Sequence, residues 1–265
     1  MSEKPVISIV TPVLNAHRFI QETVESVLAQ KGDFELEYIV RDGGSDDGTL
    51  EILRDYSDRL RVVSAPDRGP QEAVNAGLSE ARGTILAWLN ADDVYEPGAL
   101  ASAADALRPQ ARKWTYGRCC IIDEHGDEIR KAITWYKTLV GWRYSRNILL
   151  CENFISQPAV FFRRELWESA GGLATCWRAA FDYDLWLRFA RLSPAHPVHR
   201  VIARFRRHPG SISEATFERQ FEEELRLARR EGGRLHGLIH RFNTWKILTV
   251  YRWLNRRNRK HGDAT

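Results

Sequence analysis

Carboxylate side chains follow short apolar runs of this sequence, at positions that suit the binding of a nucleotide. The first is Asp42, which ends an apolar run and precedes two glycines that permit a tight turn and close approach of a ligand. Ser45 could cap a following helix, so a plain strand-to-helix turn also accounts for this segment. In the functional interpretation, the Asp42 carboxylate accepts the N3 proton of uracil or thymine.

The segment Leu89-Asn90-Ala91-Asp92-Asp93 supplies two carboxylates and an amide directly after another apolar run. Such oxygen ligands suit Mg²⁺ or Mn²⁺, hard cations that also bind phosphate oxygens. Adjacent acids at a strand end can instead cap a helix. The presence of Asp42 in the neighbouring loop favours the metal site.

Asp182 lies at the start of a run in which Phe181, Leu185 and Phe189 fall on one helical face. The helix dipole favours an ionised carboxylate at this end. Asp182 is therefore either a helix cap or a general base at the mouth of a site, and only geometry distinguishes the two.

The elements that must position these carboxylates alternate along the first hundred residues. Brief runs rich in Ile, Val and Leu predict buried strands at residues 6–10, 36–40, 60–64 and 84–89. The intervening runs have helical spacing, at residues 16–30, 46–56 and 70–81. Strands separated by helices predict an α/β fold with a mostly parallel sheet. Ligands of such sheets gather at the carboxyl ends of the strands.

The pattern changes after Pro97. We expect a hairpin of residues 114–122 and 128–133, then a helix at 136–150, a strand at 159–163, a helix at 181–192 and a strand at 198–205. Two further helices, broken at Gly232 and Gly233, follow Ser213. We expect a catalytic domain over residues 1–213, made of a nucleotide-binding half (1–110) and an acceptor half (111–213). Residues 214–265 form a helical extension.

The composition is that of a folded protein, because 43% of the residues are hydrophobic and 28% are charged. No run approaches the roughly 18 apolar residues that span a bilayer, and the first residues do not resemble a signal peptide. We therefore expect a cytoplasmic protein. The four cysteines lack metal-ligand spacing, and we interpret them as reduced, structural thiols.

Positive charge is concentrated at the C-terminal end. Residues 226–265 hold 11 basic and 2 acidic residues, a net charge of +9, whereas residues 1–225 hold 28 basic and 33 acidic residues, a net charge of −5. Residues 234–260 place an apolar stripe among basic side chains: Leu235, Leu238, Ile239, Phe242, Trp245 and Leu248. Such a helix can lie on an anionic membrane, on the inner face of the cell membrane. Equally, the stripe can pack on the protein body or on a second subunit of a homo-oligomer.

The motifs, taken together and in order, resemble those of glycosyltransferase family 2 over roughly residues 6–213. They are Ser8–Asn15, the Asp42 turn, Pro66–Gly69 with Asn75–Gly77, Leu89–Asp93, Gln157–Pro158 and Asp182–Arg188. The resemblance implies a GT-A-type fold, which is a Rossmann-like sheet flanked by helices. It also implies a nucleotide-sugar donor, a divalent cation and inversion at the anomeric carbon.

The resemblance further implies roles for individual positions. Donor-binding positions are Thr11, Pro12, Asn15, Asp42, Arg68, Asn90, Ala91 and Asp92. Asp92 matches the metal-binding acid that ends the family's Asp-any-Asp motif, whereas Asn90 replaces the first Asp and leaves less negative charge for the metal. His208 lies in a basic segment similar to those that close over the pyrophosphate, and we expect it to be a metal ligand; a merely solvated strand end is the alternative. Asp182 matches the general base.

The sequence thus predicts an inverting, metal-dependent glycosyltransferase that uses a UDP- or dTDP-sugar and either Mn²⁺ or Mg²⁺. Asp182 would remove the proton of an acceptor hydroxyl as its oxygen attacks C1 opposite the diphosphate. The acceptor would be a saccharide or lipid-linked saccharide of a bacterial surface polysaccharide such as O-antigen. We expect one or two aromatic residues to contact it, among Trp135, Tyr136, Trp142, Tyr144 and Trp177.

Two other functions remain open at this point. A sugar-phosphate nucleotidyltransferase of similar fold would carry a glycine-rich phosphate-binding segment after the first strand, which residues 11–15 lack. A non-catalytic nucleic-acid-binding protein would use the basic tail, but the acidic body disfavours nucleic acid as a partner.

Overall fold

The computed structural model describes residues 4–211 and 216–262, and their side chains as far as Thr249 except those of Phe217 and Leu248. The strands are β1 (Val6–Val13), β2 (Glu35–Asp42), β3 (Arg61–Ser64), β4 (Ile85–Trp88), β5 (Val94–Tyr95), β6 (Trp114–Ile122), β7 (Glu128–Ile129), β8 (Val160–Arg163) and β9 (His196–Arg206). The helices are α1 (Ile20–Leu28), α2 (Thr49–Arg54), α3 (Pro70–Glu80), α4 (Ala99–Leu107), α5 (Lys131–Val140), α6 (Arg146–Cys151), the 3₁₀ turn η1 (Gln157–Ala159), α7 (Arg164–Ala170), α8 (Phe181–Leu192) and α10 (Phe217–Gly262).

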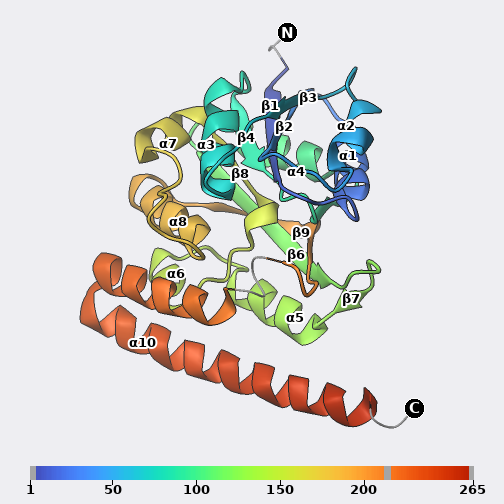
Figure 1. Ribbon diagram of the computed structural model, residues 1–265. Coiled ribbons are helices and arrows are strands. Elements are labelled where there is room, and N and C mark those ends of the chain that lie inside the picture. Colours follow the sequence, from blue (N-terminus) through green and yellow to red (C-terminus); the bar gives the residue numbers. More distant parts are fainter. Residues whose placement is uncertain (1–3, 212–215, 263–265) are drawn as a thin grey trace.

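The described strands form one sheet in the order β3-β2-β1-β4-β8-β6-β9-β5, with β7 paired to the C-terminal end of β6 (Figure 1). β1 to β4 are mutually parallel, as predicted, whereas β8 joins β4 and β6 in antiparallel register. The pairing of Val13 with Asp42 and of Val10 with Trp88 brings the carboxyl ends of β1, β2 and β4 to one edge. The α/β class is confirmed, and the second half of the sheet is mixed.

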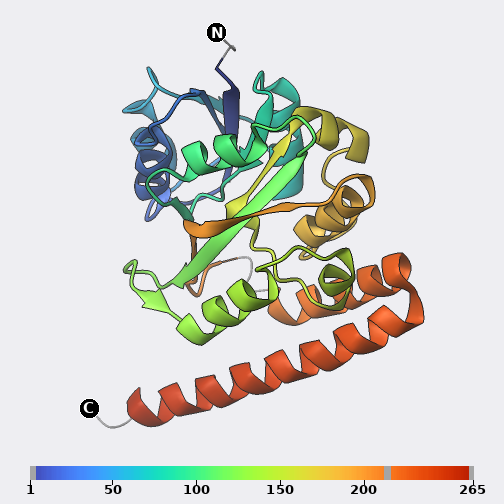
Figure 2. The same cartoon turned by 180° about the vertical axis from the view of Figure 1, so that it is seen from behind.

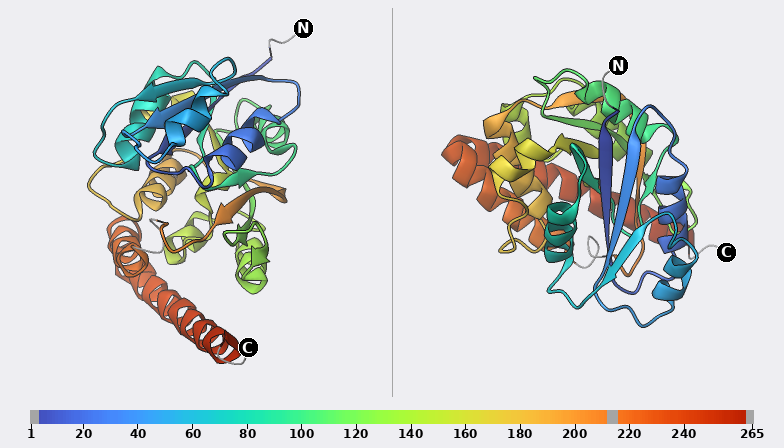
Figure 3. Two further views of the ribbon diagram at one scale, coloured as in Figure 1. Left: turned by 45° about the vertical axis from the view of Figure 1, so that its right-hand side comes forward. Right: turned by 90° about the horizontal axis from the view of Figure 1, so that it is seen from above.

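Helices cover both faces of the sheet (Figure 3). On one face, α1, α2 and α4 bury apolar side chains such as Ile20, Leu53 and Leu100 against the strands. On the other face, α3, α7 and α8 bury side chains such as Val74 and Trp167. Each strand of the sheet's centre is therefore apolar on both sides, which explains the continuous Ile, Val and Leu runs of the sequence.

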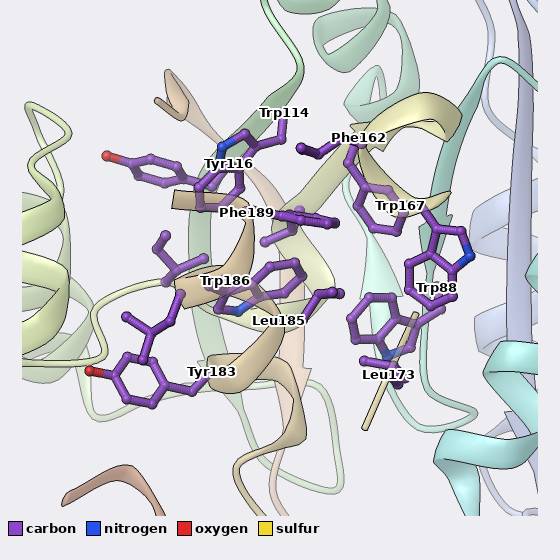
Figure 4. Packing of buried hydrophobic residues seen from close by; sticks show 14 of the residues in the cluster. Trp88, Trp114, Tyr116, Phe162, Trp167, Leu173, Tyr183, Leu185, Trp186 and Phe189 are labelled. Atoms are coloured by element: carbon purple, nitrogen blue, oxygen red, sulfur yellow. The ribbon is translucent and has the colours of Figure 1, made fainter. Parts of the chain in front are cut away.

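Stacked aromatic rings fix α8 against the sheet (Figure 4). The indole of Trp186 lies between those of Trp88 on β4 and Trp114 on β6, with ring centroids 5.5 and 5.9 Å apart. All three side chains are fully buried. Because burying large aromatic rings contributes several kcal/mol, this stack holds the helix that carries Asp182 in one place.

The C-terminal segment forms the long helix α10, which folds back beneath α6 and α8 and then runs along the end of the molecule opposite the N-terminus (Figures 1 and 2). Gly233 interrupts it with non-helical angles, φ 76° and ψ −169°, so the predicted break at this position is confirmed. The proposed division of the chain at residue 213 stays a prediction. Among the described residues, no helix has the length and apolar character needed to cross a membrane.

Several predicted elements were wrong in extent. The single helix expected at residues 136–150 is two helices, α5 and α6, separated at Gly141, where an added Cβ would lie 2.9 Å from the ring of Phe154. The second strand of the hairpin ends at Ile129, because α5 begins at Lys131. Helices α4 and α7 were not predicted at all.

Candidate active site

A cavity of 1130 Å³ opens at the carboxyl ends of β1 and β4 and extends past α8 to α10. Its volume exceeds the range of about 300–1000 Å³ that suits a single small ligand. The predicted site residues that line it are Pro12, Asn15, Asn90, Ala91, Asp92, Asp182 and His208. The structure therefore brings the predicted metal ligands and the predicted base to one cavity. Thr11, Asp42 and Arg68 are not among its lining residues.

The loop after β4 directs Asp92 to the cavity by burying its neighbour. Asp93 is fully buried, where its carboxylate accepts the backbone N–H of Arg206 at 2.9 Å and the Asn90 amide at 3.2 Å. The hydroxyl of Thr23 donates to the carbonyl oxygens of Ala91 and Asp93, at 2.9 and 2.8 Å. Asp93 thus holds the loop, and Asp92 lines the cavity.

The carboxylate of Asp92 meets the imidazole of His208, with Oδ2 and Nε2 3.2 Å apart. Burial raises the pKa of Asp92, although the hydrogen bond and charge of His208 oppose this shift. Burial and the charge of Asp92 likewise raise the pKa of Asp93. A divalent cation at Asp92 would stabilise the ionised carboxylate.

The donor set fits such a cation. Among the described residues no cluster holds three or more His, Cys, Asp or Glu ligands, so Asp92 and His208 would supply two of the positions. Mg²⁺ and related cations in nucleotide sites take few protein ligands and complete their shell with phosphate oxygens and water. The paired oxygen and nitrogen at the cavity wall match this arrangement.

Arg206 connects the loop that carries Asp92 to α1. The sequence did not predict this structural role. Its guanidinium is 1% exposed, and it donates to the Asp92 carbonyl at 2.9 Å, the Asp123 carbonyl at 3.0 Å and the Glu22 carboxylate at 2.5 Å. It also lies over the ring of Phe19, which contacts the His208 ring at a centroid distance of 4.7 Å. The basic strand end is therefore packed, not solvated, at Arg206.

The loops after β1 and β2 are fastened together. The Asp42 carboxylate accepts the N–H groups of Gly44 and Ser45 at 3.1 and 3.2 Å and the hydroxyls of Ser45 and Ser64 at 2.5 and 2.6 Å. Asn15, at φ 52°, accepts the N–H of Asp46 at 3.0 Å. Asp42 thus holds the strand-to-helix turn, and its contact with a base stays a prediction.

The other two donor positions outside the cavity have different surroundings. The hydroxyl of Thr11 is buried beside the hydroxyl of Tyr38, at 3.0 Å. Arg68 is exposed and pairs with Glu72 at 2.9 Å. Their roles in donor binding also stay predictions.

Asp182 is the second residue of α8 and lines the cavity. The surrounding protein, which displaces water, and the charge of Glu224 raise the pKa of Asp182 to about 7. Lys137 and the N–H of Tyr183, which donates to Oδ1 at 2.7 Å, oppose the shift. A carboxylate with a pKa near neutrality is well matched to proton abstraction.

Of the five aromatic residues expected near an acceptor, Tyr136 is the one found among the cavity-lining residues, and its hydroxyl donates to Glu152 at 2.8 Å. Trp142 stacks on His199, and Tyr144 packs against Trp114. The sequence reasoning missed the contribution of α10, which lines the cavity with His240, Asn243, Thr244, Lys246 and Ile247. Its polar spacing, opposite the apolar stripe, was the available signal.

The fold is of the GT-A type. Its cavity has an Asp-His pair at the carboxyl end of β4 and, on α8, a carboxylate with a raised pKa, as expected of a glycosyltransferase. The model of glycosyl transferase family 2 matches residues 8–169, and the chain belongs to this family. A PGL/p-HBAD biosynthesis glycosyltransferase of Mycobacterium tuberculosis is 30% identical over 96% of this chain and 99% of its own length.

Other relatives agree with the family. An uncharacterized glycosyltransferase of Rickettsia prowazekii is 26% identical over 90% of this chain and 77% of its own length. A Rickettsia felis glycosyltransferase is 27% identical over 77% of this chain, but the match spans 34% of that relative's length.

Solved structures share the fold. A mannosyltransferase of Pyrobaculum calidifontis in complex with GDP-Man and Mn²⁺ has a TM-score of 0.67 at 21% identity, over 87% of this chain and 66% of that chain. Residues 1–349 of S. aureus TarS in complex with UDP-GlcNAc give a TM-score of 0.66 at 18% identity, over 86% and 66% of the two chains.

Proposed function

We propose that this glycosyltransferase moves a sugar, with inversion, from a nucleoside-diphosphate donor to an acceptor hydroxyl, with UDP or dTDP as the favoured nucleotides. The observation that carries the proposal is that the Asp92–His208 pair and Asp182 line one cavity. The solved relatives support the donor class, since one complex contains GDP-Man with Mn²⁺ and another contains UDP-GlcNAc. Their different bases leave the preference for UDP or dTDP resting on the family resemblance.

In the proposed reaction, Asp92 and His208 would hold Mn²⁺ or Mg²⁺, which would supply positive charge to a diphosphate leaving group. Asp182, in its ionised form, accepts the proton of the acceptor hydroxyl as that oxygen attacks the anomeric carbon. Asn90 and Asn15 line the same cavity. The cavity's extension to α10 leaves room for an acceptor beyond Asp182.

We propose a saccharide or lipid-linked saccharide of a bacterial surface polysaccharide as the acceptor. The second half of α10 supports a lipid-linked form, because polar side chains of this helix face the cavity while its apolar stripe is exposed. His240, Asn243 and Thr244 line the cavity, whereas the apolar stripe Leu235, Leu238, Ile239, Phe242 and Trp245 is 40–67% exposed. This exposure favours contact of the stripe with a partner over packing on the body. The predicted stripe residue Leu248 lies outside the described side chains.

An anionic membrane is the partner that best fits this stripe. Its Phe and Trp side chains are flanked by Arg241 and Lys246, and residues 226–265 carry a net charge of +9. Aromatic and basic side chains on one helix are typical of helices that lie in the interface of anionic bilayers. A second copy of the chain is the competing occupant, and the vesicle experiment in the Discussion separates the two.

The proposed reaction is tested by thermal shift and by transfer assays with UDP-, dTDP- and GDP-sugars, each with and without Mn²⁺. We expect a nucleotide sugar and the metal together to raise the melting temperature more than either alone, because both bind the folded site. Asp127→Asn, on an exposed turn, is the matched control for Asp92→Asn. Stabilisation that persists in Asp92→Asn with metal would contradict the assignment of Asp92.

A further inference from the structure

The N-cap residue of α8, the helix that carries Asp182, supplies no side-chain cap. The N-cap residue is Ala180, whose side chain accepts no hydrogen bond. The first backbone N–H groups of a helix lack partners within the helix, and leaving them buried and unpaired is costly. Asp182 itself accepts the N–H of Tyr183. The N–H groups of the three residues that precede the helix, 178–180, are satisfied from elsewhere in the chain.

Glu223, on the first half of α10, accepts the N–H groups of the segment that leads into α8. One carboxylate oxygen accepts the N–H of Ala179 at 2.8 Å and of Ala180 at 3.1 Å, and the other accepts the N–H of Arg178 at 3.3 Å. Arg219 donates to the same carboxylate at 2.9 Å. The side chain is 5% exposed. Burial alone would raise its pKa, but these donors lower it, so the carboxylate is ionised at neutral pH.

The position of this contact matters because Asp182 follows Ala180 by two residues. The three N–H groups belong to the segment that leads into the helix, so the carboxylate fixes where the first turn of α8 begins. An ionised group at this end is also favoured by the helix dipole. A general base must be placed to within a fraction of an ångström, and small displacements lower rates steeply.

A second contact from α10 reaches the same turn. Arg230 donates to Asp184 at 2.7 Å, and Asp184 is 2% exposed. Trp177 donates to the same oxygen at 3.2 Å. The first half of α10 therefore holds the start of α8 from two sides, which a plain helical appendage would not do.

We propose that Glu223 is a positioning residue for Asp182, through which α10 becomes part of the catalytic machinery. The inference rests on the proposed role of Asp182 as the base. It assigns to residues 217–232 a role in turnover, distinct from the membrane contact proposed for the stripe beyond Gly233.

The test compares Glu223→Ala and Glu223→Gln with Glu222→Gln, a matched control because Glu222 is exposed on the same helix. We expect Glu223→Ala to lower kcat by roughly 10- to 100-fold while the donor KM and nucleotide affinity change by less than about twofold. Glu223→Gln, whose amide oxygen can still accept N–H groups, should recover part of kcat. Glu222→Gln should behave as wild type.

Hydrogen exchange supplies a readout that does not depend on activity. Amides of residues 178–184 should exchange faster in Glu223→Ala and at the wild-type rate in Glu222→Gln. Unchanged kcat and unchanged exchange in Glu223→Ala would overturn the inference, as would an equal loss of donor affinity and kcat. Failure of the proposed function is distinguishable, because Asp182→Asn would then keep the wild-type kcat whatever the result for Glu223.

Discussion

Trp88 and Trp186 stack with their ring centroids 5.5 Å apart, and this contact joins the strand that leads to Asp92 with the helix that carries Asp182. Each indole lies four residues from the carboxylate that it helps to place. The two ends of the proposed reaction, metal and base, are thus held by one aromatic cluster.

The stack should be a main source of stability. We expect Trp186→Ala to lower the free energy of unfolding by about 3–5 kcal/mol, because it removes a fully buried ring and leaves a cavity. Urea denaturation measures the change. Trp135→Ala is the control, since Trp135 is 65% exposed and its loss should change stability by less than about 0.5 kcal/mol. Equal effects of the two substitutions would show that the stack contributes little.

The metal assignment predicts different outcomes for two adjacent acids. Asp92→Asn and His208→Ala should each weaken Mn²⁺ binding in the presence of nucleotide by roughly tenfold or more, because each removes a ligand. Electron paramagnetic resonance of free Mn²⁺ measures this. Asp93→Asn should instead mainly lower the melting temperature, because Asp93 accepts the Arg206 N–H inside the loop. Wild-type Mn²⁺ affinity in both Asp92→Asn and His208→Ala would remove the pair from the site.

The raised pKa of Asp182, about 7, predicts the pH dependence of transfer. The ionised carboxylate is the active base, so kcat should rise with pH up to about 7 and then level off. Glu224→Gln removes a negative charge that raises this pKa, so the midpoint should move to lower pH. Asp182→Asn should lower kcat by roughly 10²-fold or more at every pH. A midpoint that is the same in wild type and Glu224→Gln would contradict this account.

The exposed stripe predicts binding to anionic vesicles. Phe242→Ser with Trp245→Ser should abolish co-sedimentation with vesicles that contain phosphatidylglycerol, and salt should weaken binding of the wild type. Neither residue lines the cavity, so nucleotide affinity should not change. Leu192→Ser, at an exposed apolar site on α8, is the control. Absence of sedimentation at low salt, or a wild-type dimer that the double substitution dissociates, would favour a protein partner.

The elements that the sequence predicts well are those with a local signal. Strands β1 and β4 are buried on both faces, and Asp92 and Asp182 stand out as candidates because they lie next to such strand and helix patterns. Helix α4 was missed because its nine residues are mostly alanine, and small side chains give little periodicity. At the break between α5 and α6, Gly141 lies against the ring of Phe154, which lies 13 residues further along the chain.

The features that the sequence did not predict depend on contacts between residues far apart in the chain. Three consecutive glutamates, residues 222–224, look alike in the sequence, yet one is exposed, one binds the backbone that leads into α8 and one lies near Asp182. The bonds of Asp42 to Ser45 and Ser64 similarly depend on the register of β2 with β3. No pattern within one segment contains this information.

The arrangement of α10, with polar side chains toward the cavity and the apolar stripe exposed, has a kinetic consequence. Because one face lines the cavity and the opposite face carries the stripe, a protein docked through the stripe searches for a lipid-linked acceptor in two dimensions. Turnover would then follow the mole fraction of acceptor in the bilayer, not its bulk concentration. Adding inert lipid at constant total acceptor would slow the enzyme by surface dilution, whereas a water-soluble acceptor would be used at an unchanged rate.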